Sequence, residues 1–167
     1  ARSVGQLIWE KAKDFLQKAF TIIFVATVLI WFLQTFDTRL NVAAPDTSLL
    51  ALIGSWVAPI FKPLGFGDWR TSTALVCGLI AKESVISTLT VLLGSTSAAA
   101  LSGMFTAPIA YVFLVFVLLY PPCVAAISTV RSELGGRYAA AVFALQVTVA
   151  WIIAFVVHTV FLLAGLL

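Results

Sequence analysis

Charged side chains are scarce in this sequence. Lysine, arginine, aspartate and glutamate make up 10% of the 167 residues, whereas soluble domains carry about 25%. The hydrophobic share is 62%, and the mean hydropathy is +1.10. So few charges could not cover so much apolar surface in water, whereas lipid can face that surface directly. The composition therefore excludes an ordinary soluble domain and predicts a protein embedded in a bilayer.

Several kinds of site are also missing. The two cysteines, Cys77 and Cys123, lie singly in apolar stretches, so neither a disulfide framework nor a CxxC zinc site is expected. No GxxxxGK(S/T) loop is present, and neither an HExxH motif nor a Ser-His-Asp arrangement suggests a catalyst. The net charge is +3, but the basic residues are scattered singly, which argues against nucleic-acid binding.

Apolar stretches divide the chain, and a spanning helix needs about 20 such residues. The stretches long enough to cross cover residues 19–36, 71–93, 105–130 and 138–167. The shorter stretch at residues 48–61 is expected to be broken by Pro59 and Pro63, and such a length is typical of a re-entrant segment. The expected fold is all-α: a polytopic transmembrane helix bundle with four long spans, one short or re-entrant segment and discontinuous helices.

Two domains are expected from this division. Residues 1–18 mix apolar and charged side chains and are predicted to form an amphipathic lead-in helix at the membrane surface. Residues 19–167 are predicted to form a transmembrane gate-type domain. Within it, residues 94–103 are small and polar, which predicts a loop.

Loop charge sets the expected orientation, because cytoplasmic loops favour lysine and arginine. With four crossings, the basic residues divide almost evenly between the two sides. With five crossings, Arg39 lies on one side, and the opposite side holds a larger basic set. That set is Arg2, Lys11, Lys13, Lys18, Lys62, Arg70, Arg131 and Arg137. We therefore favour five crossings with the N-terminus in the cytoplasm, the loop at residues 94–103 outside and the turn at residues 131–137 inside.

Two charges, Lys82 and Glu83, occur at the centre of the stretch at residues 71–93. A charge at the bilayer centre costs about 2.5–3.5 kcal/mol on insertion scales, so each needs a partner or water inside the bundle. Adjacent helical residues do not face each other, so the two charges do not pair. A place in an ion path is one interpretation. A structural ion pair with another segment, for example at Asp68 or Arg131, is the alternative.

A continuous helix here would carry a polar stripe. Glu83 and Ser87 would share one face, and Cys77, Ser84 and Thr88 would lie on a neighbouring one. The Glu83 carboxylate is a hard oxygen donor that could bind a cation directly. No helix break is predicted near Cys77, so a packing role for that thiol is favoured over metal contact.

Pro121 and Pro122 break the third long stretch, because proline has no N–H and its ring clashes with the preceding turn. The carbonyls of Val117 and Leu118 then lose their helical donors, and in lipid they must find partners in protein or a watery cavity. Free carbonyls beside the Cys123 thiol make a candidate cation site, and sulfur favours transition metals over magnesium or calcium. The alternative is a packing kink with Cys123 as a small buried residue.

Several motifs occur in a fixed order along the chain. They are WE at residues 9–10, FLQKA at 15–19, GDWR at 67–70, GLIAKE at 78–83, YPPCVA at 120–125 and RSELG at 131–135. Together they resemble the C-terminal membrane region of the bacterial ferrous-iron transporter B (FeoB) family. The resemblance covers nearly the whole chain with compatible spacing.

The resemblance implies the second of two gate repeats in a multi-pass protein of the bacterial cytoplasmic (inner) membrane, with Fe(II) as the transported ion. It also implies that the chain is a transporter segment, not an enzyme, and that it belongs to a longer polypeptide. The implied partners are the lipid bilayer, a first gate repeat and a cytoplasmic GTPase domain, with a homo-oligomer as a further possibility. No nucleotide site is expected in this chain itself.

Residue chemistry and the resemblance together give the candidate site. Cys123 is the residue that the resemblance assigns to iron contact, and Glu83 is the second candidate metal ligand. The residues expected to line or support the transport path are Lys82, Ser84, Ser87, Pro121, Pro122 and Cys77.

Two other functions stay open at this point. A gate domain for nucleosides or other organic solutes would need a pocket of aromatic and amide groups, and Gln146 in the last stretch is too little to build one. A non-transporting membrane scaffold would make Lys82, Glu83 and Cys123 purely structural. Metal binding would separate iron transport from both alternatives.

Overall fold

A computed structural model describes residues 2–80, 82, 84–94 and 98–166, and within these ranges every regular element is a helix. The elements in chain order are α1 (Arg2–Thr35), α2 (Leu49–Phe61), the 3-10 helix η1 (Lys62–Leu64), α3 (Trp69–Gly78), α4 (Ser84–Leu93), α5 (Ala98–Met104), α6 (Ala107–Leu119), α7 (Val124–Leu134) and α8 (Gly136–Leu163). The all-α prediction is confirmed.

Two segments of the described chain are long and apolar enough to cross a membrane. They are α6 with α7, which together cover Ala107–Leu134, and α8. The α2–η1 segment and α3 are apolar as a pair but are bent by 103°, so they supply a broken crossing or a re-entrant loop. The apolar part of α1 and the whole of α4 are shorter. Of the four predicted long spans, the two nearest the C-terminus are therefore confirmed and the other two are not.

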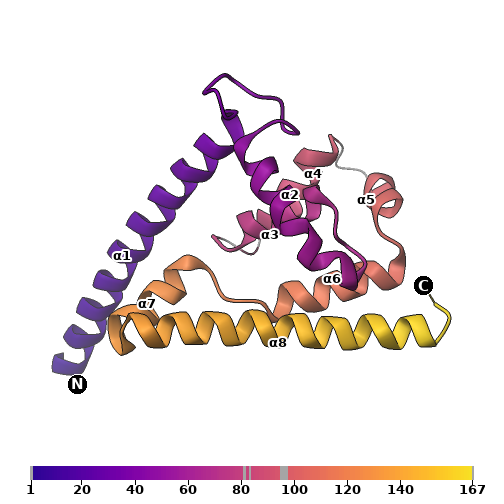
Figure 1. Ribbon diagram of the computed structural model, residues 1–167. Helices are drawn as coiled ribbons and strands as arrows, with labels where there is room; N and C mark the ends of the chain where they lie inside the picture. Colours follow the sequence, from indigo (N-terminus) through magenta and orange to yellow (C-terminus); the bar gives the residue numbers. More distant parts are fainter. Residues whose placement is uncertain (1, 81, 83, 95–97, 167) are drawn as a thin grey trace.

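The two long segments form an antiparallel pair. The chain runs along α6 and α7, reverses at Gly135, and returns along α8, as Figure 1 shows. Gly135 has a φ of 92°, a conformation that favours glycine. Ala150 and Ala154 of α8 are fully buried one turn apart, and such small residues allow two helices to approach closely.

An aromatic cluster joins this pair to the α2–α3 segment. Phe61 and Phe66 pack edge-on against Phe116 and Phe113, with ring centroids 5.2 and 5.4 Å apart. Beside them, the Trp151 indole N–H of α8 donates a hydrogen bond of 3.0 Å to the Ile60 carbonyl near the end of α2. The bend between α2 and α3 is thus held against the long hairpin.

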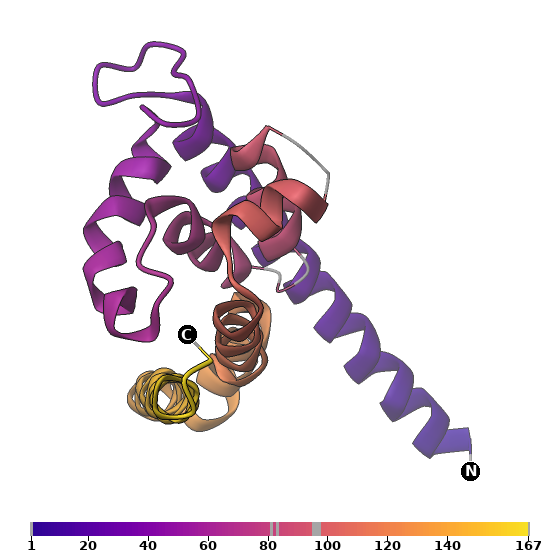
Figure 2. The same ribbon diagram turned by 90° about the vertical axis from the view of Figure 1, so that its right-hand side faces the viewer.

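The first helix is continuous from Arg2 to Thr35, so the predicted lead-in helix and first span form one element. It contacts α2 and α7, and Figures 1 and 2 show it extending away from the other helices. Its large apolar side chains are exposed at many positions, including Trp9, Phe20 and Phe24. Lipid or other protein must cover this surface.

Two local predictions were wrong. The stretch at residues 48–61 was expected to be broken at Pro59, but α2 continues through Pro59 to Phe61 after an N-cap bond from Ala51 N–H to the Ser48 hydroxyl. The stretch at residues 94–103 was expected to be a loop, but residues 98–104 form α5. Alanine and leucine have high helix propensity, which explains this short helix.

Candidate functional site

Two helix breaks meet in this structure. The first lies between the end of α3 at Gly78 and the start of α4 at Ser84, and the second separates α6 from α7 at residues 120–123. The Val124 N–H donates a hydrogen bond of 2.9 Å to the Leu79 carbonyl, which ties one break to the other. A Cβ at Gly78 would collide with Val85 and with the Tyr120 hydroxyl, so the close approach requires glycine.

Lys82 donates hydrogen bonds to carbonyl groups that the second break leaves without helical donors. Its Nζ donates to the Tyr120 carbonyl at 2.9 Å and to the Leu118 carbonyl at 3.2 Å, and it lies 5.0 Å from the centre of the Tyr120 ring. In an unbroken helix the Leu118 carbonyl would accept from residue 122, which is a proline, and the Tyr120 carbonyl would accept from Val124. The Val124 N–H bonds to the other break instead. Lys82 therefore replaces both missing donors.

This geometry confirms one prediction and corrects another. The break at Pro121–Pro122, with its open carbonyl at Leu118, was predicted from proline chemistry and is confirmed. The continuous helix through residues 71–93 was wrong, because the chain unwinds after Gly78. Because the chain unwinds here, Lys82 can reach neutral carbonyl groups. Within the described residues its hydrogen-bond partners are therefore carbonyls, and not the carboxylates that a structural ion pair would require. The polar stripe expected on that helix does not form as one face.

The predicted site residues are distributed unevenly around this junction. Cys123 is the N-cap residue of α7, is partly exposed, and directly follows the break whose carbonyls bond to Lys82. Pro121 beside it is fully buried, and Pro122 is partly exposed. The structure thus brings Lys82, Pro121, Pro122 and Cys123 together.

Three other predicted site residues are not part of this group at the junction. Ser84 is the first residue of α4, next to the first break. Ser87 is exposed on the face of α4 away from the buried Val85, so it does not line the junction. Glu83 lies outside the described residues. Within the described part, no three histidine, cysteine, aspartate or glutamate side chains gather as a metal cluster.

Cys77 has a different environment from the one predicted. It was placed in a helix without a nearby break, but it is the penultimate residue of α3, directly before the first break. It is buried, as a packing thiol would be. Its sulfur accepts a hydrogen bond from Gln34 Nε2 of α1 at 3.8 Å and is also hydrogen-bonded to the Thr88 side chain of α4. Three helices therefore meet at this thiol.

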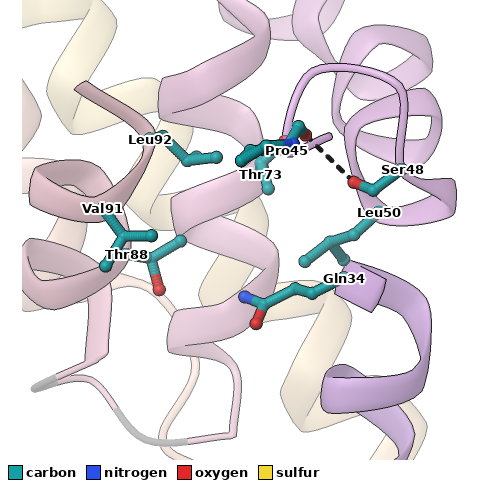
Figure 3. Close-up of a pocket in the computed structure, with 8 residues that line it drawn as sticks. All are labelled: Gln34, Pro45, Ser48, Leu50, Thr73, Thr88, Val91 and Leu92. Carbon is teal, nitrogen blue, oxygen red and sulfur yellow. Dashed lines mark hydrogen bonds between the residues drawn. The ribbon is translucent and has the colours of Figure 1, made fainter. Parts of the chain in front are cut away.

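A small cavity of about 80 Å³ lies beside Cys77. It is lined by Gln34, Pro45, Ser48, Leu50, Thr73, Thr88, Val91 and Leu92. In Figure 3 the Gln34 amide and the Thr88 hydroxyl point toward one another across it. Gln34 was not predicted as a site residue, although it is the one amide in the apolar stretch at residues 19–36.

Comparison with known proteins gives a consistent result. The Gate family, described as nucleoside recognition, matches residues 16–137. The Fe(2+) transporter FeoB of Methanocaldococcus jannaschii is 33% identical over 91% of this chain and 24% of its own length. That of Staphylococcus aureus strain COL is 35% identical over 95% of this chain and 24% of its own length. That of Campylobacter jejuni is 36% identical over 90% of this chain and 27% of its own length.

The chain thus spans about a quarter of the length of the curated relatives that it matches. No solved structure matches it.

Proposed function

The chain belongs to the Gate family as a membrane region of the FeoB type, and we propose that it is the C-terminal permease part, the second gate repeat, of a ferrous-iron transporter. The observation that carries the proposal is the junction of two helix breaks, at which Lys82 bonds two backbone carbonyls beside Cys123. Ion sites in secondary transporters are commonly built from such discontinuous helices.

Fe(II) must exchange hydration water for protein ligands at such a junction. Cys123 supplies a sulfur donor of the kind that favours a transition metal. The carbonyls of Leu118 and Tyr120 supply oxygen, and Lys82 holds them in this structure. The ammonium group occupies the position of a cation, so it competes with the ion for these oxygens. Glu83, the next residue in the sequence after Lys82, is the proposed source of the compensating negative charge.

The rest of the transporter is proposed from the relatives. The partners are a first gate repeat and a cytoplasmic GTPase domain of the same protein, in the bacterial inner membrane. The exposed apolar surface of α1 fits contact with lipid or with the other repeat.

Iron uptake tests this function directly. In cells that depend on the full-length transporter, we expect uptake of Fe(II) but not of Mg²⁺, and we expect Glu83→Gln to lower Fe(II) uptake severalfold while the protein still inserts. Glutamine keeps the size of the side chain but removes the charge that would compensate a cation in lipid. Radioactive iron in washed cells, normalised to protein in the membrane fraction, gives the measurement. Uptake equal to that of the parent would reduce Glu83 to a structural residue, and no uptake by the parent itself would refute the proposal.

Topology gives an independent test. Thr106, before α6, and Ser132, near the end of α7, lie at opposite ends of the segment predicted to cross. Cysteines introduced singly at these positions should react with a membrane-impermeant maleimide from opposite sides, Thr106→Cys from outside and Ser132→Cys from the cytoplasm. The parent protein controls for labelling of Cys77 and Cys123. Labelling of both new cysteines from the same side would contradict the crossing.

A further inference from the structure

One polar group at the junction of the two helix breaks has no partner among the described residues. The Tyr120 side chain is 4% exposed, and its hydroxyl oxygen is buried without a hydrogen bond. Nearly all buried polar groups in native proteins are paired, so an unpaired one needs an explanation. The arrangement of the junction in this structure therefore carries the cost of a buried, unsatisfied hydroxyl.

This hydroxyl lies against the segment that carries Lys82. The Tyr120 oxygen and a methyl group of Val85 both occupy the space where a Cβ on Gly78 would sit. Gly78 is the last residue of α3 and Val85 is the second residue of α4, so the two residues flank the first break. Lys82 lies between them in the chain. The hydroxyl end of the Tyr120 side chain is thus enclosed by the two ends of the break to which Lys82 belongs.

Lys82 already contacts two other parts of Tyr120. Its Nζ donates to the Tyr120 carbonyl at 2.9 Å and lies 5.0 Å from the centre of the ring. The face of an aromatic ring attracts a cation, so the ring offers the ammonium a favourable surface between the carbonyl and the hydroxyl. A lysine ammonium carries three donors on a flexible stem, and a tyrosine hydroxyl can accept a hydrogen bond. The ammonium can therefore pass from one oxygen to the other by rotation of its own side chain.

The ammonium needs such an acceptor when an ion binds at the junction. If Fe(II) takes the carbonyls of Leu118 and Tyr120, Lys82 loses both of its hydrogen bonds. An ammonium without a partner is costly away from water. The one unpaired oxygen of Tyr120 lies beside the same break, on the same side chain whose ring the ammonium contacts.

We propose that the Tyr120 hydroxyl is the acceptor that receives the Lys82 ammonium when an ion displaces it from the two carbonyls. Tyr120 is then a positioning residue of the transport cycle. The inference rests on the proposed function, because it takes Fe(II) as the displacing ion. It gives the unpaired hydroxyl a physical role: the state in which the carbonyls hold the ammonium is raised in free energy, and pairing of the hydroxyl after displacement favours ion entry.

Tyr120→Phe tests this role, because phenylalanine keeps the ring and its contact with the ammonium and removes only the hydroxyl. In nanodiscs without iron, the full-length variant should melt at or above the temperature of the parent, since an unsatisfied group has been removed. In proteoliposomes, its KM for Fe(II) should rise about tenfold, the factor that corresponds to 1.4 kcal/mol. The increase in melting temperature that Fe(II) gives to the parent should shrink in the variant. A residue that only stabilised the fold would shift the melting temperature equally with and without Fe(II).

Two further variants complete the test. Tyr111→Phe removes the hydroxyl of an exposed tyrosine of α6 and should change neither quantity. In the Lys82→Met background no ammonium needs an acceptor, so adding Tyr120→Phe should not change the effect of Fe(II) on the melting temperature. A further loss there would make the hydroxyl an iron ligand and overturn the acceptor role. An unchanged KM in Tyr120→Phe, with Fe(II) transported by the parent, would overturn it as well, whereas a parent that does not transport Fe(II) would refute the proposed function itself.

Discussion

Replacement of Lys82 by methionine is expected to destabilise the protein by about 2–4 kcal/mol and to abolish its transport activity. The substitution leaves the carbonyls of Leu118 and Tyr120 without their donor, and an acceptor that finds no partner away from water costs about 1–3 kcal/mol. It also removes the contact of the ammonium with the Tyr120 ring. Water, which would repair such a loss on a soluble surface, is not available in the hydrocarbon region. The melting temperature in nanodiscs measures the stability, and iron uptake measures the activity.

Three further variants show whether the carbonyl bonds cause the effect. Lys82→Arg keeps several donors and should recover part of the stability. Lys13→Met removes an exposed lysine from α1 and should change nothing. Pro122→Ala restores an N–H four residues after Leu118, so it should rescue part of the loss in Lys82→Met. Wild-type stability of Lys82→Met, or no rescue by Pro122→Ala, would show that Lys82 does not replace the missing helical donors.

Proline chemistry made one of the two helix breaks predictable from the sequence. Pro121 and Pro122 remove two N–H groups whatever surrounds them, so the break follows from local covalent structure. The break after Gly78 has no such local cause. It depends on hydrogen bonds between two segments that are far apart in the chain. The Val124 N–H donates to the Leu79 carbonyl, and the Lys82 ammonium donates to the Tyr120 carbonyl. Helical periodicity therefore predicted one continuous span at residues 71–93, and tertiary contacts decided otherwise.

The environment of Cys77 could not be predicted for the same reason. Its partners, Gln34 and Thr88, lie on two other helices, and only the packing of α1 and α4 around α3 brings them to the sulfur. Composition, in contrast, was sufficient to predict the membrane class and the two long C-terminal spans, because those depend on the sum of local hydropathy. These two spans could be predicted because each depends on the hydropathy of one segment, whereas the geometry of the site depends on contacts between segments.

The position of Lys82 also explains how a charge is tolerated in an apolar segment. An isolated ammonium at the bilayer centre is costly, but here it bonds two carbonyls that are themselves costly when unpaired. Each group reduces the penalty of the other. The two carbonyls thus already bind a cationic group, the Lys82 ammonium, when no metal ion is bound. If Fe(II) takes the carbonyls, the ammonium must leave them, so ion entry and a conformational change at the break are coupled.

The largest effect on iron selectivity is expected at Cys123. Cys123→Ser should lower Fe(II) uptake at least about tenfold, the factor that corresponds to 1.4 kcal/mol of lost ligand free energy. Serine keeps the small size of the side chain but removes the soft sulfur donor. Cys123 is the N-cap residue of α7 and makes no side-chain capping bond, whereas serine is among the best N-cap residues. The variant should therefore be as stable as the parent or slightly more stable, so lower uptake cannot be attributed to unfolding.

Cys77→Ser is the matched control for this substitution. Its hydroxyl can keep the hydrogen bonds to Gln34 and Thr88, so stability and uptake should change little, although Cys77 lies directly before a helix break. Uptake of Fe(II) and of Mg²⁺ is compared in cells that depend on the full-length transporter, at matched amounts of protein in the membrane. Loss of Fe(II) uptake in Cys123→Ser but not in Cys77→Ser identifies the sulfur at the second break as the selective ligand. Unchanged uptake in Cys123→Ser would mean that this thiol only packs, and that discrimination between metals lies in another part of the transporter.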